Sequence, residues 1–76
     1  MAIQRYHIEY APSAIDDLRS LPKREADQIL RKVLRLENGL HGNIKRLRMG
    51  DYRVLFDVIG DKILVQKVGN RKDVYE

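Results

Sequence analysis

Residues 44–68, with the sequence IKRLRMGDYRVLFDVIGDKILVQKV, decide the fold of this chain. Three runs rich in β-branched and aromatic residues are separated by the dipeptides Gly50-Asp51 and Gly60-Asp61. Such runs are typical of strands, and both dipeptides contain a residue that can take the positive φ of a tight hairpin. The segment therefore predicts a three-stranded antiparallel meander, with strands over residues 44–49, 52–59 and 62–68.

The part of the chain before this segment predicts one strand and two helices. Residues 3–10 alternate apolar and polar side chains and predict a strand. Ser13 followed by Asp16 resembles a capping box, and apolar residues follow at helical spacing until Pro22 breaks the run. A second apolar stripe begins after Lys23 and ends at stop signals, which are Asn38-Gly39 and Gly42-Asn43.

The order of predicted elements is β-α-α-β-β-β, which indicates an α+β fold. Two helices joined near Pro22 are expected to form a helical hairpin packed on one face of an antiparallel sheet that the first strand also joins. The opposite face of the sheet is expected to stay partly open. We find no repeat, low-complexity stretch or linker, so residues 1–76 are expected to form a single domain.

The charge of the chain is positive and unevenly distributed. The formal net charge is +4 over 76 residues. Residues 1–41 carry seven Lys and Arg against six Asp and Glu, whereas residues 42–76 carry eight against five. A basic C-terminal half suggests a polyanionic partner, either nucleic acid or an acidic peptide, but a merely well-solvated surface accounts for the charge equally well.

The composition excludes several classes of protein. There are no cysteines, which rules out disulfides, thiolate metal sites and cysteine nucleophiles. No apolar run approaches the ~20 residues needed to cross a bilayer, and the first residues lack the layout of a signal peptide. We therefore expect a cytoplasmic protein with no membrane partner.

Three arginines fall on or next to one predicted hairpin. Arg46 and Arg48 share one face of their strand because side chains alternate along it. On the next strand Tyr52, Val54 and Phe56 are assigned to the core, which places Arg53 on the uncovered face. A guanidinium in such a position calls for an anion, and this can be a ligand or Asp57 two residues further on.

Other chemical groups give weaker signals. His7 and His41 lack the spacing of metal ligands, and no Gly-rich phosphate loop is present, so we expect no metal ion and no cofactor. After the last strand, Arg71 and Lys72 add cations, and Tyr75 adds a phenol that can transfer a proton or stack on a base.

Two segments carry a family resemblance. LRMGDYRVLF at residues 47–56 and VGNRKDVY at residues 68–75 resemble the signature of RelE-type toxins in the RelE/ParE superfamily. IEYAPSA at residues 8–14, with Asp17-Leu18 and Leu21-Pro22 behind it, is similar to the first strand and helix of that superfamily. The resemblance spans essentially the whole chain and implies the RelE-like fold.

The resemblance also implies a function. It implies the toxin of a type II toxin-antitoxin system, which the acidic segment of a cognate antitoxin holds inactive and which contacts operator DNA only through that antitoxin. The free toxin is expected to enter the ribosomal A site and cleave mRNA without a metal, leaving a 2′,3′-cyclic phosphate. By position, the catalytic residues implied are Arg53, Arg71 and Tyr75, and the substrate-binding residues are Lys45, Arg46, Arg48 and Lys72.

Two alternatives remain open at the level of sequence. Members of the ParE branch poison DNA gyrase, and because they share the fold, the fold cannot separate the two activities. A member that only binds its antitoxin is the other alternative. Asn70 stands where many relatives have His, which leaves Tyr75, Lys45, Lys72 or the RNA and ribosome themselves to carry protons.

Overall fold

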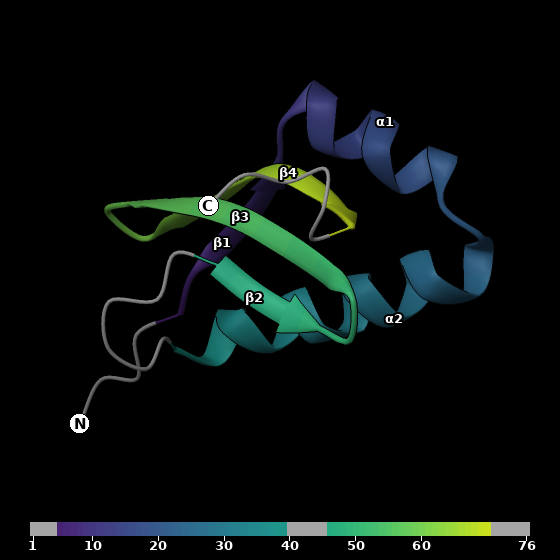
Figure 1. Cartoon of the computed structure of the whole chain (residues 1–76). Coiled ribbons are helices and arrows are strands. Elements are labelled where there is room, and N and C mark those ends of the chain that lie inside the picture. Colours follow the sequence, from purple (N-terminus) through teal and green to yellow (C-terminus); the bar gives the residue numbers. More distant parts are fainter. Residues whose placement is uncertain (1–4, 40–45, 71–76) are drawn as a thin grey trace.

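The computed structural model describes residues 5–39 and 46–70, and its elements follow the predicted order (Figure 1). A short 3₁₀ helix, η1, is added after the second α-helix. The elements are β1 (His7–Tyr10), α1 (Pro12–Ser20), α2 (Lys23–Leu34), η1 (Arg35–Asn38), β2 (Arg46–Met49), β3 (Tyr52–Ile59) and β4 (Lys62–Asn70).

The four strands form one mixed sheet in the order β1-β4-β3-β2. The predicted meander is confirmed, because β2–β3 and β3–β4 pair antiparallel. The first strand joins the sheet as expected, but it pairs parallel to β4. No hairpin connects β1 to β4, and the helices carry the chain back between them, so β1 is free to lie parallel.

Two-residue turns set the register of the meander. Met49 lies opposite Tyr52, and Ile59 lies opposite Lys62, which leaves only the Gly-Asp dipeptides in the loops. The glycines Gly50 and Gly60 have φ of 58° and 62°, and no non-glycine residue among those described has a positive φ. Glycine at the first central position alone is the pattern of a type II′ turn, whose twist matches that of the strands.

A β-bulge interrupts the pairing of β3 with β4. Leu55 lies opposite Lys67 while Phe56 lies opposite Val65, so Gln66 is the extra residue of β4. The burial of Val65 and Val68, which are three positions apart, requires this shift because side chains of a regular strand alternate faces.

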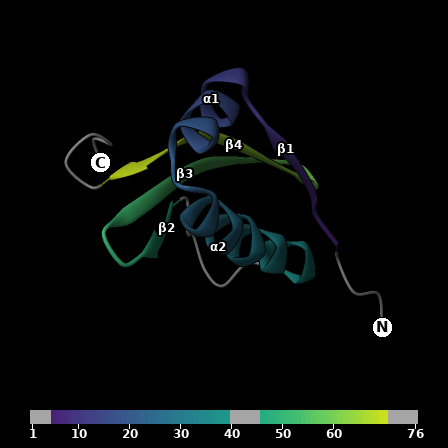
Figure 2. The same cartoon turned by 90° about the vertical axis from the view of Figure 1, so that its right-hand side faces the viewer.

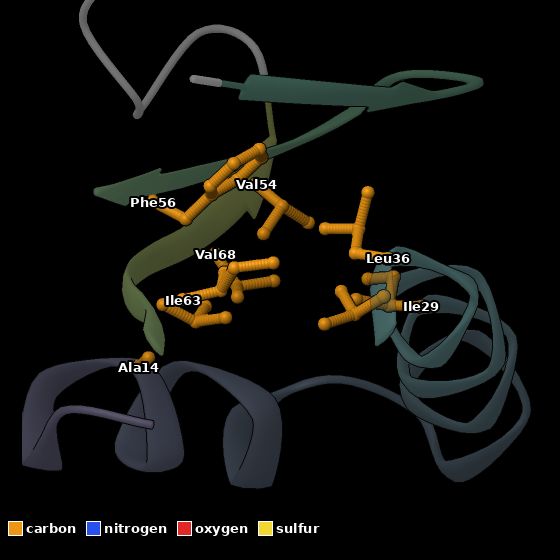
Figure 3. Close-up of a cluster of buried hydrophobic side chains, with 9 residues drawn as sticks. Ala14, Ile29, Leu36, Val54, Phe56, Ile63 and Val68 are labelled. Atoms are coloured by element: carbon orange, nitrogen blue, oxygen red, sulfur yellow. The ribbon is translucent and has the colours of Figure 1, made fainter. Parts of the chain in front are cut away.

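The core lies between the sheet and the two helices (Figure 3). The helices bury aliphatic side chains, and the strands supply the rest. The buried residues are Ala14, Ile29, Val33, Leu36, Val54, Phe56, Ile63, Val65 and Val68. The expected division of β3 is confirmed, because Val54 and Phe56 are buried and Tyr52 packs against them.

Helix α1 closes the edge of β4 that β1 leaves unpaired. The Ser13 hydroxyl donates a hydrogen bond to the Gln66 carbonyl over 2.7 Å, and the Val68 N–H donates to Asp17 Oδ2 over 3.0 Å. Backbone groups at an exposed strand edge are thereby satisfied by side chains of a helix.

The predicted capping box at Ser13 is wrong. Helix α1 begins at Pro12, its N-cap is Ala11, and no side chain caps it. Proline suits the first helical position because its φ is already helical and its missing N–H would have no helical partner. Ser13 therefore lies inside the first turn, where its hydroxyl is available to the bulge of β4.

The predicted break at Pro22 is confirmed, since α2 starts at Lys23 with Pro22 as its N-cap. Figure 2 looks at the two helices with the strands behind them, and α2 lies alongside β2. The 3₁₀ helix ends at Gly39, whose φ is 132°. Within the described residues, no helix is long and apolar enough to cross a membrane.

Candidate functional site

The sheet face turned away from the helices carries a cluster of cations, and we call it the open face. It is formed by the residues that alternate with the core residues of β3 and by their partners on β2 and β4. Its central residues are Arg46, Arg48, Arg53, Leu55, Lys67 and Gly69.

Arg48 and Arg53 are direct cross-strand partners on the open face. The Cβ atoms of such a pair lie about 4.5–5.5 Å apart, and like charges at this separation destabilise a sheet. On the other side of Arg53 the cross-strand partner is Gly69, which has no side chain. Two neighbouring guanidiniums on one face can bind an anion through two parallel hydrogen bonds.

The three arginines differ in exposure. Arg46 and Arg48 are exposed, whereas Arg53 is half-buried and its Nε atom is shielded from solvent. The position of Arg53 on a central strand and the burial of its stem restrict how its guanidinium can move. A restricted cation costs little reorganisation when charge develops next to it, which is the property that electrostatic catalysis requires.

A second row of the open face contains Arg46, Leu55 and Lys67. Lys67 was not predicted from the sequence, because the bulge at Gln66 changes which residues of β4 face this way. The consecutive polar residues Gln66 and Lys67 break the alternation of the strand, and this is the signal that was available. Lys67 Nζ lies 4.0 Å from Asp17 Oδ2, so part of its charge is balanced by α1.

Asp57 is the carboxylate that the sequence offered as a structural partner for Arg53. In the structure Asp57 Oδ2 accepts a hydrogen bond from Gln66 Nε2. This contact crosses the bulge and fixes the extra residue of β4. Asp57 is thus engaged in holding the sheet geometry next to the open face.

The structure brings together three of the predicted site residues, Arg46, Arg48 and Arg53. The other four, Lys45, Arg71, Lys72 and Tyr75, lie outside the described residues, so their predicted roles stay predictions.

Two further titratable groups lie on β1. His7 Nε2 is 3.9 Å from Asp61 Oδ2, and both side chains are exposed. The pKa of Tyr10 is raised from its usual value of 10.0 because burial disfavours the phenolate. Among the residues described, no group of three His, Cys, Asp or Glu side chains could hold a metal ion.

A cavity of about 240 Å³ lies between α1 and the point where β3 begins and β4 ends. Its wall combines the Tyr52 ring with polar groups of α1 and of β4. It is lined by Asp17, Ser20, Leu21, Tyr52, Lys67, Val68, Gly69 and Asn70. The lining shares Lys67 and Gly69 with the open face, whereas Arg48 and Arg53 are not part of it.

Solved structures with the same arrangement of helices and strands are known. The RelBE2 toxin-antitoxin complex of Mycobacterium tuberculosis contains a chain with a TM-score of 0.76 and 20% identity, covering 95% of this chain and 98% of that chain. A chain of the RelE–RelB complex of Pyrococcus horikoshii has a TM-score of 0.73 and 25% identity, covering 92% and 99%. This chain has the RelE fold.

The RelE fold is also seen in the isolated RelE toxin of E. coli, with a TM-score of 0.68, 22% identity and coverage of 86% of this chain and 83% of that one. No protein-family model matches the sequence, and no curated protein matches it. The expected RelE-like α+β fold is therefore confirmed by shape, at sequence identities of 20–25%.

Proposed function

We propose that this chain is the toxin of a type II toxin-antitoxin system and that it cleaves mRNA on the ribosome. The observation that carries the proposal is the direct pairing of Arg48 with Arg53 next to Gly69 on the open face. The RelE fold supports the same conclusion, because the neighbours in M. tuberculosis and P. horikoshii are described as toxin-antitoxin complexes.

The proposed reaction is an attack of an RNA 2′-OH on the adjacent phosphorus. A bond forms between the 2′ oxygen and phosphorus, and the bond from phosphorus to the 5′ oxygen breaks. The products are a 2′,3′-cyclic phosphate and a 5′-OH end. Negative charge grows on the phosphoryl oxygens in the transition state, and the guanidiniums of Arg53 and Arg48 stabilise it.

Two protons move in this reaction. One leaves the attacking 2′-OH, and one is taken up by the departing 5′ oxygen. Arginine is too basic to exchange protons at neutral pH, so Arg53 acts through its charge. The proposed proton carriers are Tyr75, Lys45 and Lys72, or groups of the RNA and ribosome, and Arg71 is the proposed second source of positive charge.

The proposed partner in the inactive state is a cognate antitoxin with an acidic segment. The open face offers cations on three adjacent strands and the apolar side chains of Leu55 and Leu64 on the same face. An extended or helical acidic peptide fits such a surface. We expect this segment to cover Arg46 or Arg53, and a complex in which both remain exposed to solvent would contradict this part of the proposal.

The proposal is tested with Arg53→Ala. We expect this variant to lose growth arrest and to stop cleaving mRNA in translating ribosomes, with a fall in rate of roughly 100-fold or more because one transition-state contact is removed. Arg24→Ala is the matched control, since Arg24 is an exposed arginine on α2, away from the open face. Cleavage ends should carry a 2′,3′-cyclic phosphate in the wild type and in the control.

Other outcomes would favour the alternative functions. Full toxicity of Arg53→Ala together with trapped gyrase–DNA cleavage complexes would replace the nuclease by a gyrase poison. If expression of the wild-type chain causes no growth arrest, the remaining hypothesis is a protein that only binds its antitoxin.

A further inference from the structure

A second cationic site lies on the helical side of the edge strand β2. Helix α2 lies alongside β2 (Figures 1 and 2). Lys32 Nζ donates a hydrogen bond to the Arg48 carbonyl over 2.7 Å and so links the two elements. Beside this contact is an open groove of about 370 Å³, which we call the α2 groove. It is lined by Gln28, Arg31, Lys32, Arg35 and Met49.

The wall of the α2 groove holds three cations and no carboxylate. Arg31 and Arg35 are exposed and four positions apart, a spacing at which like charges cost a helix roughly 0.2–0.5 kcal/mol. Within the described part of the chain, neither arginine forms an ion pair. The helix dipole favours cations near the end of α2, but it does not explain their gathering around one hollow.

The α2 groove is one strand away from the open face. Arg46 and Arg48 project from β2 on the face turned away from the helices, while Arg31 and Arg35 approach β2 from the helical side. Strand β2 is the edge of the sheet, so no further strand separates the two sets of cations at this rim. Together they surround β2 with positive charge on both faces.

We propose that the α2 groove binds phosphates of an RNA backbone that continues around β2 from the open face. Arginine suits this role because its planar guanidinium can grip a phosphate with two hydrogen bonds. The identity of the polyanion as RNA rests on the proposed function. The groove adds a binding site on the other side of the molecule from the Arg48–Arg53 pair.

The lining favours a nucleic acid backbone over an acidic protein segment. Peptide interfaces draw most of their affinity from buried apolar or aromatic anchors. Met49 is the single apolar residue in the wall of the α2 groove, and the hollow is open. A phosphate backbone needs no such anchor, because its affinity comes from neutralised charge and released counterions.

The test is RNA binding by the full chain, measured by fluorescence anisotropy against salt concentration. The probes are a single-stranded 2′-O-methyl oligonucleotide and a 2′-O-methyl hairpin, which lack the nucleophile and therefore cannot be cut. The double variant Arg31→Gln/Arg35→Gln should bind roughly tenfold more weakly at low salt. For the single strand its salt slope should fall by about 1.4, at about 0.7 for each lost phosphate contact.

The control is Lys23→Gln/Arg24→Gln, which removes the same charge from the exposed start of the same helix, outside the α2 groove. We expect it to change the affinity less than threefold. Thermal unfolding of the groove variant should be unchanged or shifted slightly upward, since the repulsion between Arg31 and Arg35 is removed. This measurement separates a binding defect from a folding defect.

The outcomes distinguish single-stranded from structured RNA, and RNA from an acidic protein. If the affinity for the single strand depends on Arg31 and Arg35, the groove binds message-like RNA. If the affinity for the hairpin depends on them, it binds structured RNA. Equal losses in the groove variant and the control, or no loss with either probe, would overturn the proposal. Tighter, groove-dependent binding of polyglutamate would also overturn it, in favour of an acidic protein. Because neither probe can be cut, these results are independent of whether Arg53→Ala abolishes cleavage.

Discussion

Asp17 shows how one side chain can connect two layers of this small protein. Its carboxylate accepts a hydrogen bond from the Val68 N–H and lies 4.0 Å from Lys67 Nζ, so a helix residue holds β4 just beyond the bulge. The next residues of β4 are Gly69, which faces Arg53, and Asn70. The position of the open face relative to the helix therefore depends on this contact.

Asp17→Ala should lower the free energy of unfolding by about 1–2 kcal/mol. The variant leaves a part-buried N–H without its acceptor and removes the nearby charge from Lys67. Urea denaturation measures the loss. Asp16→Ala, a change at the exposed neighbouring carboxylate, should cost far less; similar losses in the two variants would rule out a special role for Asp17.

Tyr10 should make stability fall at alkaline pH. Burial raises the pKa of this phenol above 10.0, so between that pH and its folded pKa the unfolded chain releases a proton that the folded chain retains. The contribution of Tyr10 to the free energy of unfolding is fully present below pH 10.0 and is lost as the pH rises through the pKa of the folded state. Tyr10→Phe should remove this part of the loss, seen in the difference between the two denaturation curves from pH 8 to pH 11. Parallel curves for the two proteins would contradict it.

At the scale of elements, the sheet is specified mainly by its turns. Gly50 and Gly60 adopt φ values that favour glycine, and each is followed by an aspartate without positive φ. Each turn thereby fixes a register in which Val54, Ile63 and their neighbours all face the helices. A slip by one residue would reverse the faces of a whole strand.

Gly60→Ala should destabilise the fold by roughly 1–2 kcal/mol, because a Cβ is unfavourable at φ 62° even though no atom lies within 4 Å of its position. The loss is therefore due to the backbone alone. Asp51→Ala, at the ordinary second position of the other turn, is the control in thermal unfolding. An equal drop in the midpoint for both variants would argue against the turn assignment.

The strands of the meander could be predicted from sequence because their signals are local. The period of the side chains and the Gly-Asp dipeptides place β3 at Tyr52–Ile59 without knowledge of the rest of the chain. The parallel direction of β1 and the role of Ser13 could not be predicted in this way. Each depends on a contact between residues about fifty positions apart, which local patterns do not encode.

The same difference between local signals and distant contacts applies to the residues of the candidate site. Arg46, Arg48 and Arg53 could be placed on one face because hairpin geometry relates β2 to β3 directly. Lys67 was missed although the break in alternation at Gln66 and Lys67 indicates the bulge. The α2 groove could not be found, because it depends on the approach of α2 to β2. The spacing of Arg31 and Arg35 was visible, but on an isolated helix it indicates only a solvated side.

At the scale of the molecule, a core of nine buried residues in the described part supports a surface dense in positive charge. Net charge of one sign destabilises a compact state through self-repulsion, and a thin core offers little to offset it. Binding of the proposed acidic antitoxin would supply both opposite charge and further buried surface. The folded chain is therefore expected to gain much of its stability from binding.

The proposed antitoxin should raise the thermal midpoint by roughly 10 °C or more. A partner present at about 100 times its Kd stabilises a folded protein by ~2.7 kcal/mol, and each kcal/mol corresponds to several degrees for a domain of this size. Differential scanning fluorimetry of the complex against the free chain measures this. The gain should shrink for Arg46→Ala/Arg53→Ala, and an undiminished gain would place the partner elsewhere.

The parallel pairing of β1 with β4 sets the time at which this protein can form during its own synthesis. β1 is synthesised first, but its partner in the sheet, residues 62–65 of β4, belongs to the last of these strands to be synthesised. The hydrogen bonds of α1 to Gln66 and Val68 likewise cannot form before β4 has been made. A sheet closed by such distant contacts cannot assemble on a partly made chain. The growing chain therefore carries only an incomplete sheet until β4 has been added and has emerged from the ribosome.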